Sequence, residues 1–339
     1  MVTDRTRLVN GQSRSVCREE YALVGYAKLR MGEPHLMRRN YWIVLLVIAL
    51  PFLATWFALR GGVRGRMPDL VWGRRGIMPG DVVRPRAAVI IADTLFVVDF
   101  TARIQSYDLD GRHTGVSFTT PDFRDGRPSG LGMDNEGNLL VCDSHYHCVR
   151  IYDATGNLLR TIGNSAQLGY VSDCVQDEAG HYYVAEFGVT DRITKLDNAG
   201  SVLKRWGETG NEAGQFQRVR SLAFGPDGNL YVADACNHRL QVFNLNGDWL
   251  RTIGGPGDAP GQFHYPYDLA FGPDKMLYVV ERGNARVQKF QPDGTWVGSW
   301  GMPGRSMGQL ADPWALAVDR FGRVHVIDTE NHRVQRIAF

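Results

Sequence analysis

The chain is predicted to fold into an all-β, six-bladed β-propeller that follows a single transmembrane helix. Three observations lead to this fold class. A short, mostly apolar run that ends in an acid recurs six times, each copy belongs to a group of four strand-like runs, and one 19-residue stretch near the N-terminus carries no charge. The 39 glycines among 339 residues indicate many turns, which suits short strands better than long helices.

The recurring run sets the period of the repeat. It reads FVVD, LVCD, YVAE, YVAD, YVVE and HVID, and it ends at Asp99, Asp143, Glu186, Asp234, Glu281 and Asp328. Successive acids are 43 to 48 residues apart. This spacing is near the length of a four-stranded propeller blade and well above that of a helical repeat.

Each unit divides into four short strands. In the fourth unit the strand-like runs are "SLAFGP", "LYVAD", "RLQVFN" and "WLRTIG", and turn-forming residues such as "PDGN" and "NGD" separate them. Four antiparallel strands repeated six times close naturally into a ring of blades. Runs such as "LYVA" lack polar alternation, which indicates strands that are buried on both faces.

The last unit stops after its third strand, at Phe339. Its missing strand has a candidate at the other end of the repeats, because "DLVWGRRG" at 69–76 resembles the unit ends "LKRWG" and "VGSWG". We therefore expect residues 69–73 to complete the last blade and to close the ring, which leaves no exposed sheet edge.

These units resemble the repeats of the NHL family. The resemblance is carried by "DACNHRLQVFNLNGDWLRTIG", by "DTENHRVQRI" and by the "GQF" segments at 214 and 261, although the second of these continues into "GPDK" where the family pattern has "GPDG". It covers residues 69–339 and implies a six-bladed propeller. It also implies the binding of proteins, glycans or other ligands, and in some members RNA binding. The related amidating lyase propeller holds zinc with histidines at its axial mouth.

The N-terminal part is expected to hold a tail at 1–40, a membrane helix at 41–59 and a linker at 60–68. The uncharged segment "YWIVLLVIALPFLATWFAL" is about as long as a membrane span requires, and aromatic residues stand at both of its ends. A buried core helix and a cleaved signal peptide are the alternatives. An early single span favours a propeller outside the cytoplasm, and Met1, Met31 and Met37 stay open as the true start.

The net charge of the repeats argues against a nucleic-acid partner. Residues 69–339 carry 27 Lys and Arg against 32 Asp and Glu, a formal charge of −5. A nucleic-acid surface usually shows an excess of basic residues. RNA binding is therefore the least favoured function.

The repeated polar residues are expected to be scaffold. An arginine opens the third strand of five units and should pair with the acid of its own unit: Arg103, Arg192, Arg239, Arg286 and Arg333. In the second unit Cys148 takes this place, so Asp143 needs another partner, such as Arg150 or water. His147, His238 and His332 belong to separate units, whereas a zinc site needs ligands that converge. We expect no metal, no cofactor and no catalytic set.

The function is therefore expected where the units differ. Equivalent positions at the start of the first strands, near the axis, hold Arg86, Ser129, Ser172, Arg220, Tyr267 and Trp314. We predict a solvated ligand site at this axial mouth, formed by Arg86, Arg220, Tyr267 and Trp314 with Asp173 and Asp268 nearby. Two arginines favour a carboxylate, phosphate or sulfate, and the acids favour a mixed-charge protein, peptide or glycan partner. The alternative is a lyase or hydrolase that uses the same mouth.

Overall fold

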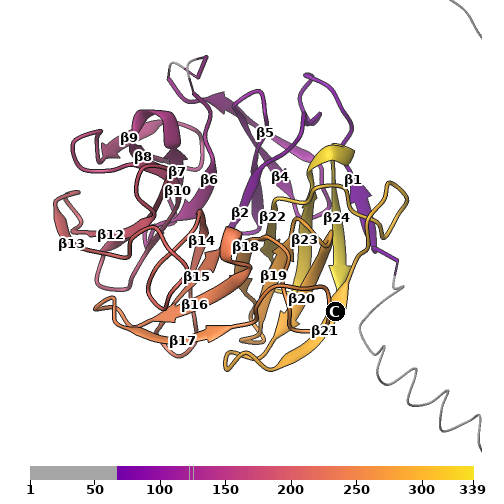
Figure 1. The fold of residues 1–339 in the computed structure, drawn as a ribbon. Coiled ribbons are helices and arrows are strands. Elements are labelled where there is room, and N and C mark those ends of the chain that lie inside the picture. The colour runs from indigo at the N-terminus through magenta and orange to yellow at the C-terminus, as the bar shows by residue number, and fades with distance from the viewer. Residues whose placement is uncertain (1–66, 122, 125) are drawn as a thin grey trace, which may run out of the picture. The chain divides into compact units, whose positions relative to one another are not determined.

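The computed structural model of the protein describes residues 67–121, 123–124 and 126–339, and these fold into six antiparallel sheets. Each sheet has four strands, and the sheets stand around one axis as the blades of a propeller (Figure 1). The predicted all-β fold class and the predicted number of blades are confirmed.

The N-terminal segments predicted from the sequence lie outside this part of the chain. They are the tail at 1–40, the membrane helix at 41–59 and most of the linker at 60–68. Within the described residues, no helix is long and apolar enough to cross a membrane. The membrane helix therefore stays a prediction.

Five blades consist of four consecutive strands each. The first blade holds β2 (Ala87–Ile91), β3 (Thr94–Val98), β4 (Arg103–Asp108) and β5 (His113–Thr119). The second holds β6 (Gly130–Met133), β7 (Leu139–Asp143), β8 (Cys148–Tyr152) and β9 (Leu158–Ile162). The third holds β10 (Tyr170–Gln176), β11 (Tyr182–Phe187), β12 (Arg192–Leu196) and β13 (Val202–Trp206).

The fourth blade holds β14 (Val219–Phe224), β15 (Leu230–Asp234), β16 (Arg239–Phe243) and β17 (Trp249–Ile253). The fifth holds β18 (Pro266–Phe271), β19 (Leu277–Glu281), β20 (Arg286–Phe290) and β21 (Trp296–Trp300). Single turns of 3-10 helix follow the second strand in three blades: η1 (Ser144–Tyr146), η2 (Ala235–Asn237) and η3 (Thr329–Asn331). The first strands of neighbouring blades contact one another all the way around the ring.

The sixth blade takes its outer strand from the start of the described chain. Its strands are, in spatial order, β22 (Ala315–Val318), β23 (Arg323–Asp328), β24 (Arg333–Ala338) and β1 (Leu70–Trp72). β1 pairs antiparallel with β24, and the two lie side by side in Figure 1 as a violet and a yellow strand. Arg336 of β24 forms ion pairs with Asp69 and Asp110, both at 2.9 Å. The ring is thus closed by joining its first residues to its last.

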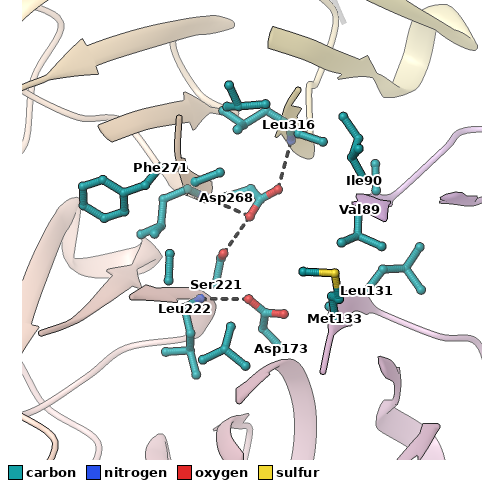
Figure 2. Close-up of a pocket in the computed structure, with 18 of the residues that line it drawn as sticks. Val89, Ile90, Leu131, Met133, Asp173, Ser221, Leu222, Asp268, Phe271 and Leu316 are labelled. Carbon is teal, nitrogen blue, oxygen red and sulfur yellow. Dashed lines mark hydrogen bonds between the residues drawn. The ribbon is translucent and has the colours of Figure 1, made fainter. Parts of the chain in front are cut away.

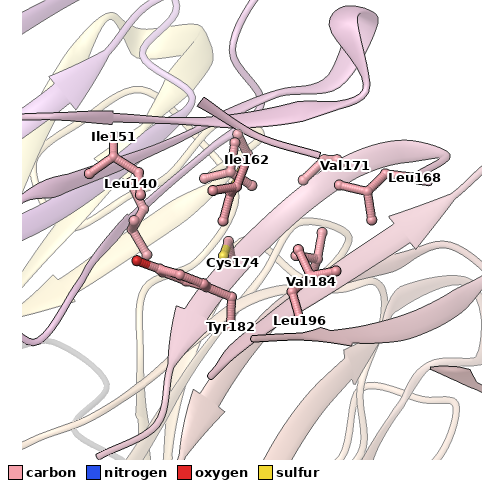
Figure 3. Close-up of a cluster of buried hydrophobic side chains, with 11 residues drawn as sticks. Leu140, Ile151, Ile162, Leu168, Val171, Cys174, Tyr182, Val184 and Leu196 are labelled. Atoms are coloured by element: carbon pink, nitrogen blue, oxygen red, sulfur yellow. The ribbon is translucent and has the colours of Figure 1, made fainter. Parts of the chain in front are cut away.

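The hydrophobic core is divided among the interfaces between neighbouring blades. In β15, Leu230 and Val232 pack against the third blade, whereas Tyr231 and Ala233 pack against the fifth. Successive side chains of a strand point to opposite faces, so each second strand supplies two interfaces. Figure 3 shows the corresponding cluster between the second and third blades. Burial on both faces is the physical reason for the continuous apolar runs in the sequence.

One buried carboxylate at the end of the second strand ties most blades together. We call the segment that runs into the first strand of a blade its lead-in loop. In the fourth blade, Asp234 accepts hydrogen bonds from Arg239 at 2.8 Å and from Gln241 at 3.1 Å. Its other oxygen accepts the backbone N–H of Gln217 in the lead-in loop at 2.7 Å. Arg239 and Gln241 also donate to the carbonyl of Gln215 in the same loop.

The predicted acid–arginine pairs are confirmed in five blades. They are Arg103–Asp99, Arg192–Glu186, Arg239–Asp234, Arg286–Glu281 and Arg333–Asp328. In the second blade, where Cys148 replaces the arginine, Asp143 pairs with Arg150 at 2.8 Å. These recurring pairs are scaffold contacts, because each of them fastens a lead-in loop or a hairpin of its own blade.

The three equivalent histidines link neighbouring blades. The Nδ1 atom of His238 accepts the backbone N–H of Tyr265, at 3.1 Å, in the lead-in loop of the next blade. His332 accepts the backbone N–H of Arg84 in the same way, at 2.9 Å. His147 lies 2.8 Å from the carbonyl oxygen of Gly169. These contacts explain why the histidine recurs with the repeat.

Candidate functional site

A pocket of about 460 Å³ lies at the propeller axis, on the face where the first strands begin. We call it the axial pocket. It is lined by Arg86, Arg124, Gly126, Arg127, Ser129, Ser144, His145, Tyr170, Phe187, Arg218, Arg220 and Trp314. Five of these residues are arginines, and none of the described lining residues is acidic. The pocket therefore has a strongly positive character, although the propeller as a whole is mildly acidic.

The floor of the axial pocket is a narrow ring formed by the first strands. All six equivalent first-strand residues predicted from the sequence line this ring: Arg86, Ser129, Ser172, Arg220, Tyr267 and Trp314. The ring encloses only about 20 Å³, roughly the space of one water molecule. It therefore separates the axial pocket from the other end of the propeller channel.

Stacking between arginines and aromatic rings fills this ring. The guanidinium of Arg220 lies 4.5 Å from the ring centroid of Tyr267, and that of Arg86 lies 4.9 Å from the ring centroid of Trp314. Tyr267 and Trp314 meet edge to face with their centroids 5.4 Å apart. A cation over the face of an aromatic ring is attracted by the ring quadrupole, and the attraction grows when water is excluded.

The prediction that these residues are exposed to solvent at the mouth is wrong for two of them. Arg220 is only 7% exposed and Tyr267 only 3%, because the six first strands converge tightly around them. The Nε atoms of Arg86 and Arg220 are buried without a hydrogen-bond partner. Burial lowers the pKa of Arg86 to about 10, helped by the neighbouring Arg220 and Arg127, and burial also lowers the pKa of Arg220. Neither guanidinium forms an ion pair with an acid among the described residues, although the nearby carboxylates of Asp268 and Asp173 partly offset the effect of burial on the pKa of Arg220.

The two predicted acids line the ring together with the arginines and also line a second cavity. Asp173 and Asp268 line a rear pocket of about 300 Å³ on the other side of the ring, and neither lines the axial pocket. Apolar side chains such as Val89, Leu131 and Phe271 make up much of this cavity (Figure 2). The predicted residues therefore meet at the ring, but the acids and the arginines face different pockets beyond it.

The acids join neighbouring blades through hydrogen bonds. Asp173 accepts the backbone N–H of Leu222 at 2.8 Å, and Asp268 accepts the Ser221 hydroxyl at 2.6 Å and the backbone N–H of Leu316 at 2.9 Å (Figure 2). Burial raises the pKa of Asp173 to about 6. Burial, together with the nearby Asp173 carboxylate, raises the pKa of Asp268 to about 7.

Reasoning from the sequence missed the rim of the axial pocket. Arg127 and Arg218 stand two residues before the floor positions Ser129 and Arg220, and both line the pocket. The signal that could have found them is their nearness in sequence to the floor positions, as "RPS" at 127–129 and "RVR" at 218–220.

The residues do not fit the zinc site that the family resemblance implies for lyase-type propellers. Among the described residues, no three His, Cys, Asp or Glu side chains gather closely enough to hold a metal ion. We therefore derive no chemical step through a metal. The axial pocket offers guanidinium groups and aromatic faces, which bind and orient anions.

Comparisons with known proteins point to one repeat family. The family model of the NHL repeat matches residues 126–152 and 216–243. NHL repeat-containing protein 3 of Mus musculus is 29% identical over 116 residues, which cover 31% of this chain and 33% of the relative. Peptidyl-glycine alpha-amidating monooxygenase A of Xenopus laevis is 31% identical over 131 residues, which cover 34% of this chain and 14% of the relative. The chain thus spans a third or less of these relatives.

Solved structures share the architecture. A streptogramin B lyase structure matches with a TM-score of 0.56 at 13% identity and covers 76% of this chain and 94% of that one. An inactive virginiamycin B lyase from Staphylococcus aureus, solved with quinupristin, matches with a TM-score of 0.57 at 16% identity and covers 78% and 84%. At such identities the likeness shows the fold alone.

Replacing Asp268 with Asn is expected to change how stability depends on pH. The pKa of Asp268 is raised from about 4 in the unfolded chain to about 7 in the folded one. The stabilising contribution of the protonated carboxyl is thus full below about pH 4 and is lost as the pH rises through 7. Thermal melts between pH 4 and 8 should show the native protein losing stability relative to Asp268→Asn as the pH rises.

The exposed Asp258 provides the control for this experiment. The melting temperature of Asp258→Asn should run parallel to that of the native protein over the same pH range. A constant difference in melting temperature between Asp268→Asn and the native protein would contradict the raised pKa.

Proposed function

Because the chain is an NHL-repeat propeller, we propose that it is a non-catalytic binding module that holds an anionic ligand in its axial pocket. The single observation that carries this proposal is the state of Arg220. Its side chain is buried in the floor of the pocket, and its Nε atom has no hydrogen-bond partner. A buried cation without a partner is costly, so a site that keeps one gains most from an anion that arrives with the ligand.

The chemistry of the floor defines the group that would bind there. Guanidinium groups pair with carboxylate, phosphate or sulfate through two parallel hydrogen bonds. Trp314 also lines the pocket and offers an aromatic surface to a planar or apolar part of the ligand. Since Asp173 and Asp268 do not line the axial pocket, the ligand does not need a positive group to match them there. A protein, peptide or glycan partner would present its anionic group to this floor.

A lyase or hydrolase activity in the same pocket is the second candidate. It is favoured by the partial matches to peptidyl-glycine alpha-amidating monooxygenases and by the position of His145, whose imidazole lines the pocket. An imidazole is the side chain that most often transfers protons in general acid–base catalysis. Turnover of a bound ligand that is lost in His145→Gln would favour this candidate over the binding module.

We also propose that residues 41–59 tether the propeller to a membrane, with the propeller outside the cytoplasm. The support is the uncharged stretch of 19 residues with aromatic residues at both ends. A tethered propeller would present its axial pocket to ligands close to the membrane surface.

Replacing Arg220 with Met is expected to weaken anion binding without harming the fold. Methionine fills a similar space and can pack on Tyr267, and the change removes a buried, unpaired charge, so the melting temperature should be unchanged or higher. Affinity for 2-naphthoate, measured by calorimetry, should fall by about 30-fold, close to 2 kcal/mol, as for a binding anchor. Arg305→Gln, which changes an exposed arginine outside the pocket, is the matched control and should bind normally. If the native protein and Arg220→Met bind 2-naphthoate equally well, the proposal is wrong.

Removing residues 41–59 is expected to release the protein from membranes. The full chain should sediment with the membrane fraction in high salt, because burial of an apolar span does not depend on ionic strength. The deleted protein should stay in the supernatant, whereas deletion of 19 residues from the tail, 2–20, should leave the protein in the pellet. If the protein that lacks 41–59 still sediments with membranes, residues 41–59 are not the membrane anchor.

A further inference from the structure

We infer that the ligand of the axial pocket is a small di- or polycarboxylate, with one carboxylate bound at the floor and a second bound at the rim. This inference rests on the proposed function and specifies the class of ligand. It is drawn from the arrangement of four arginines in two tiers: Arg86 and Arg220 at the floor, and Arg127 and Arg218 at the rim.

Two arginines of one short segment stand in different tiers. Arg218 and Arg220 belong to the same segment at the start of the fourth blade, and both line the axial pocket. Arg220 also lines the narrow ring below it, whereas Arg218 does not. Arg218 is exposed, whereas Arg220 is buried. One segment thus presents one guanidinium at depth and one nearer to solvent.

Each tier is held by an aromatic ring. At the rim, the guanidinium of Arg127 lies 4.1 Å from the ring centroid of Phe100, and that of Arg218 lies 5.6 Å from the ring centroid of Phe187. At the floor, the guanidinium of Arg220 stacks on the ring of Tyr267 in the same way. A guanidinium that stacks on a ring face keeps its N–H groups at the edge, where they can reach a carboxylate. Stacking therefore orients these arginines without using their hydrogen-bond donors.

One monoanion would leave most of this charge unmatched. The described lining residues include five arginines and no acid. The arginines of the two tiers also repel one another. Beside the larger effect of burial, the positive charges of Arg220 and Arg127 both help to lower the pKa of Arg86. A carboxylate at the floor would relieve only part of the repulsion among the arginines. A second carboxylate at the rim would relieve more, and it would be tied to the first by the ligand itself.

The acids of the rear pocket do not line the axial pocket. Asp173 and Asp268 line the ring and the cavity on its other side, and their oxygens accept hydrogen bonds from neighbouring blades. Asp99 and Asp234 are engaged with their own third-strand arginines, and the buried Asp191 lies beside the backbone N–H of Arg218. Within the described residues, no ion pair joins an acid to the side chain of Arg127 or Arg218, so both can meet a ligand.

The test compares matched aromatic acids on the full-length protein. Binding of 2-naphthoate is measured beside that of naphthalene-2,6-dicarboxylate, and benzoate beside isophthalate and terephthalate, so that only the second carboxylate and its spacing differ. We expect at least one dicarboxylate to bind about tenfold more tightly than its monocarboxylate. The gain should shrink as salt is raised, since the rim arginines are exposed.

Variants assign the two carboxylates to the two tiers. Arg218→Gln should remove the advantage of the dicarboxylate and weaken the binding of the monocarboxylate much less, whereas Arg220→Met should weaken both. Arg305→Gln should change neither. If every dicarboxylate binds no better than its monocarboxylate, while binding still depends on Arg220, the inference is overturned and the proposed function stands. If no probe binds in a manner that depends on Arg220, both are overturned.

Discussion

The buried carboxylate at the end of the second strand is the contact on which the rest of this propeller depends. It accepts a hydrogen bond from the arginine of the third strand and a backbone N–H from the lead-in loop, so one side chain joins three segments of a blade. Its removal would leave a guanidinium without a counter-charge and an N–H group without an acceptor in the interior, which costs more than the lost bonds themselves. In the fourth blade, the N–H that Asp234 binds belongs to Gln217, the residue before Arg218. The contact that holds the blade therefore also positions the arginines of the axial pocket.

The second blade lacks part of this contact, and its lead-in loop lines the axial pocket. Asp143 pairs with Arg150, but its Oδ1 atom is buried without a hydrogen bond, and burial raises the pKa of this carboxyl. Its lead-in loop contributes Arg127 to the rim and places Gly126 against His145, where a Cβ atom would come within 2.1 Å of the histidine side chain. Local rules of a fold are most often broken at functional sites. The blade whose scaffold contact is incomplete thus also lines the pocket that we propose binds the ligand.

The repeat made the fold predictable from sequence, since the acid at Asp234 and its equivalents mark every second strand and the "DLVWG" segment matches the missing outer strand. The six first-strand positions were also predictable, because equivalent positions in a closed ring must meet at the axis. The burial of Arg220 and Tyr267 was not, because it depends on how tightly six strands converge, which no single blade reveals. The division of Asp268 and Arg220 between the rear pocket and the axial pocket was not predictable either, because it depends on which side of a narrow ring each side chain faces. The rim arginines stand two residues before floor positions in the sequence, but this spacing does not fix where their side chains lie, because Arg218 has a positive φ of 61°.

The most direct test of the axial pocket as an anion site is anomalous diffraction from crystals of the protein soaked in bromide. Bromide is a mobile anion that reports where unpaired positive charge is accessible. Our account predicts an ordered bromide against the guanidiniums of Arg86 and Arg220 at the floor, and a second one beside Arg127 or Arg218 at the rim. Bromide peaks confined to the outer surface, with only water in the axial pocket, would contradict it.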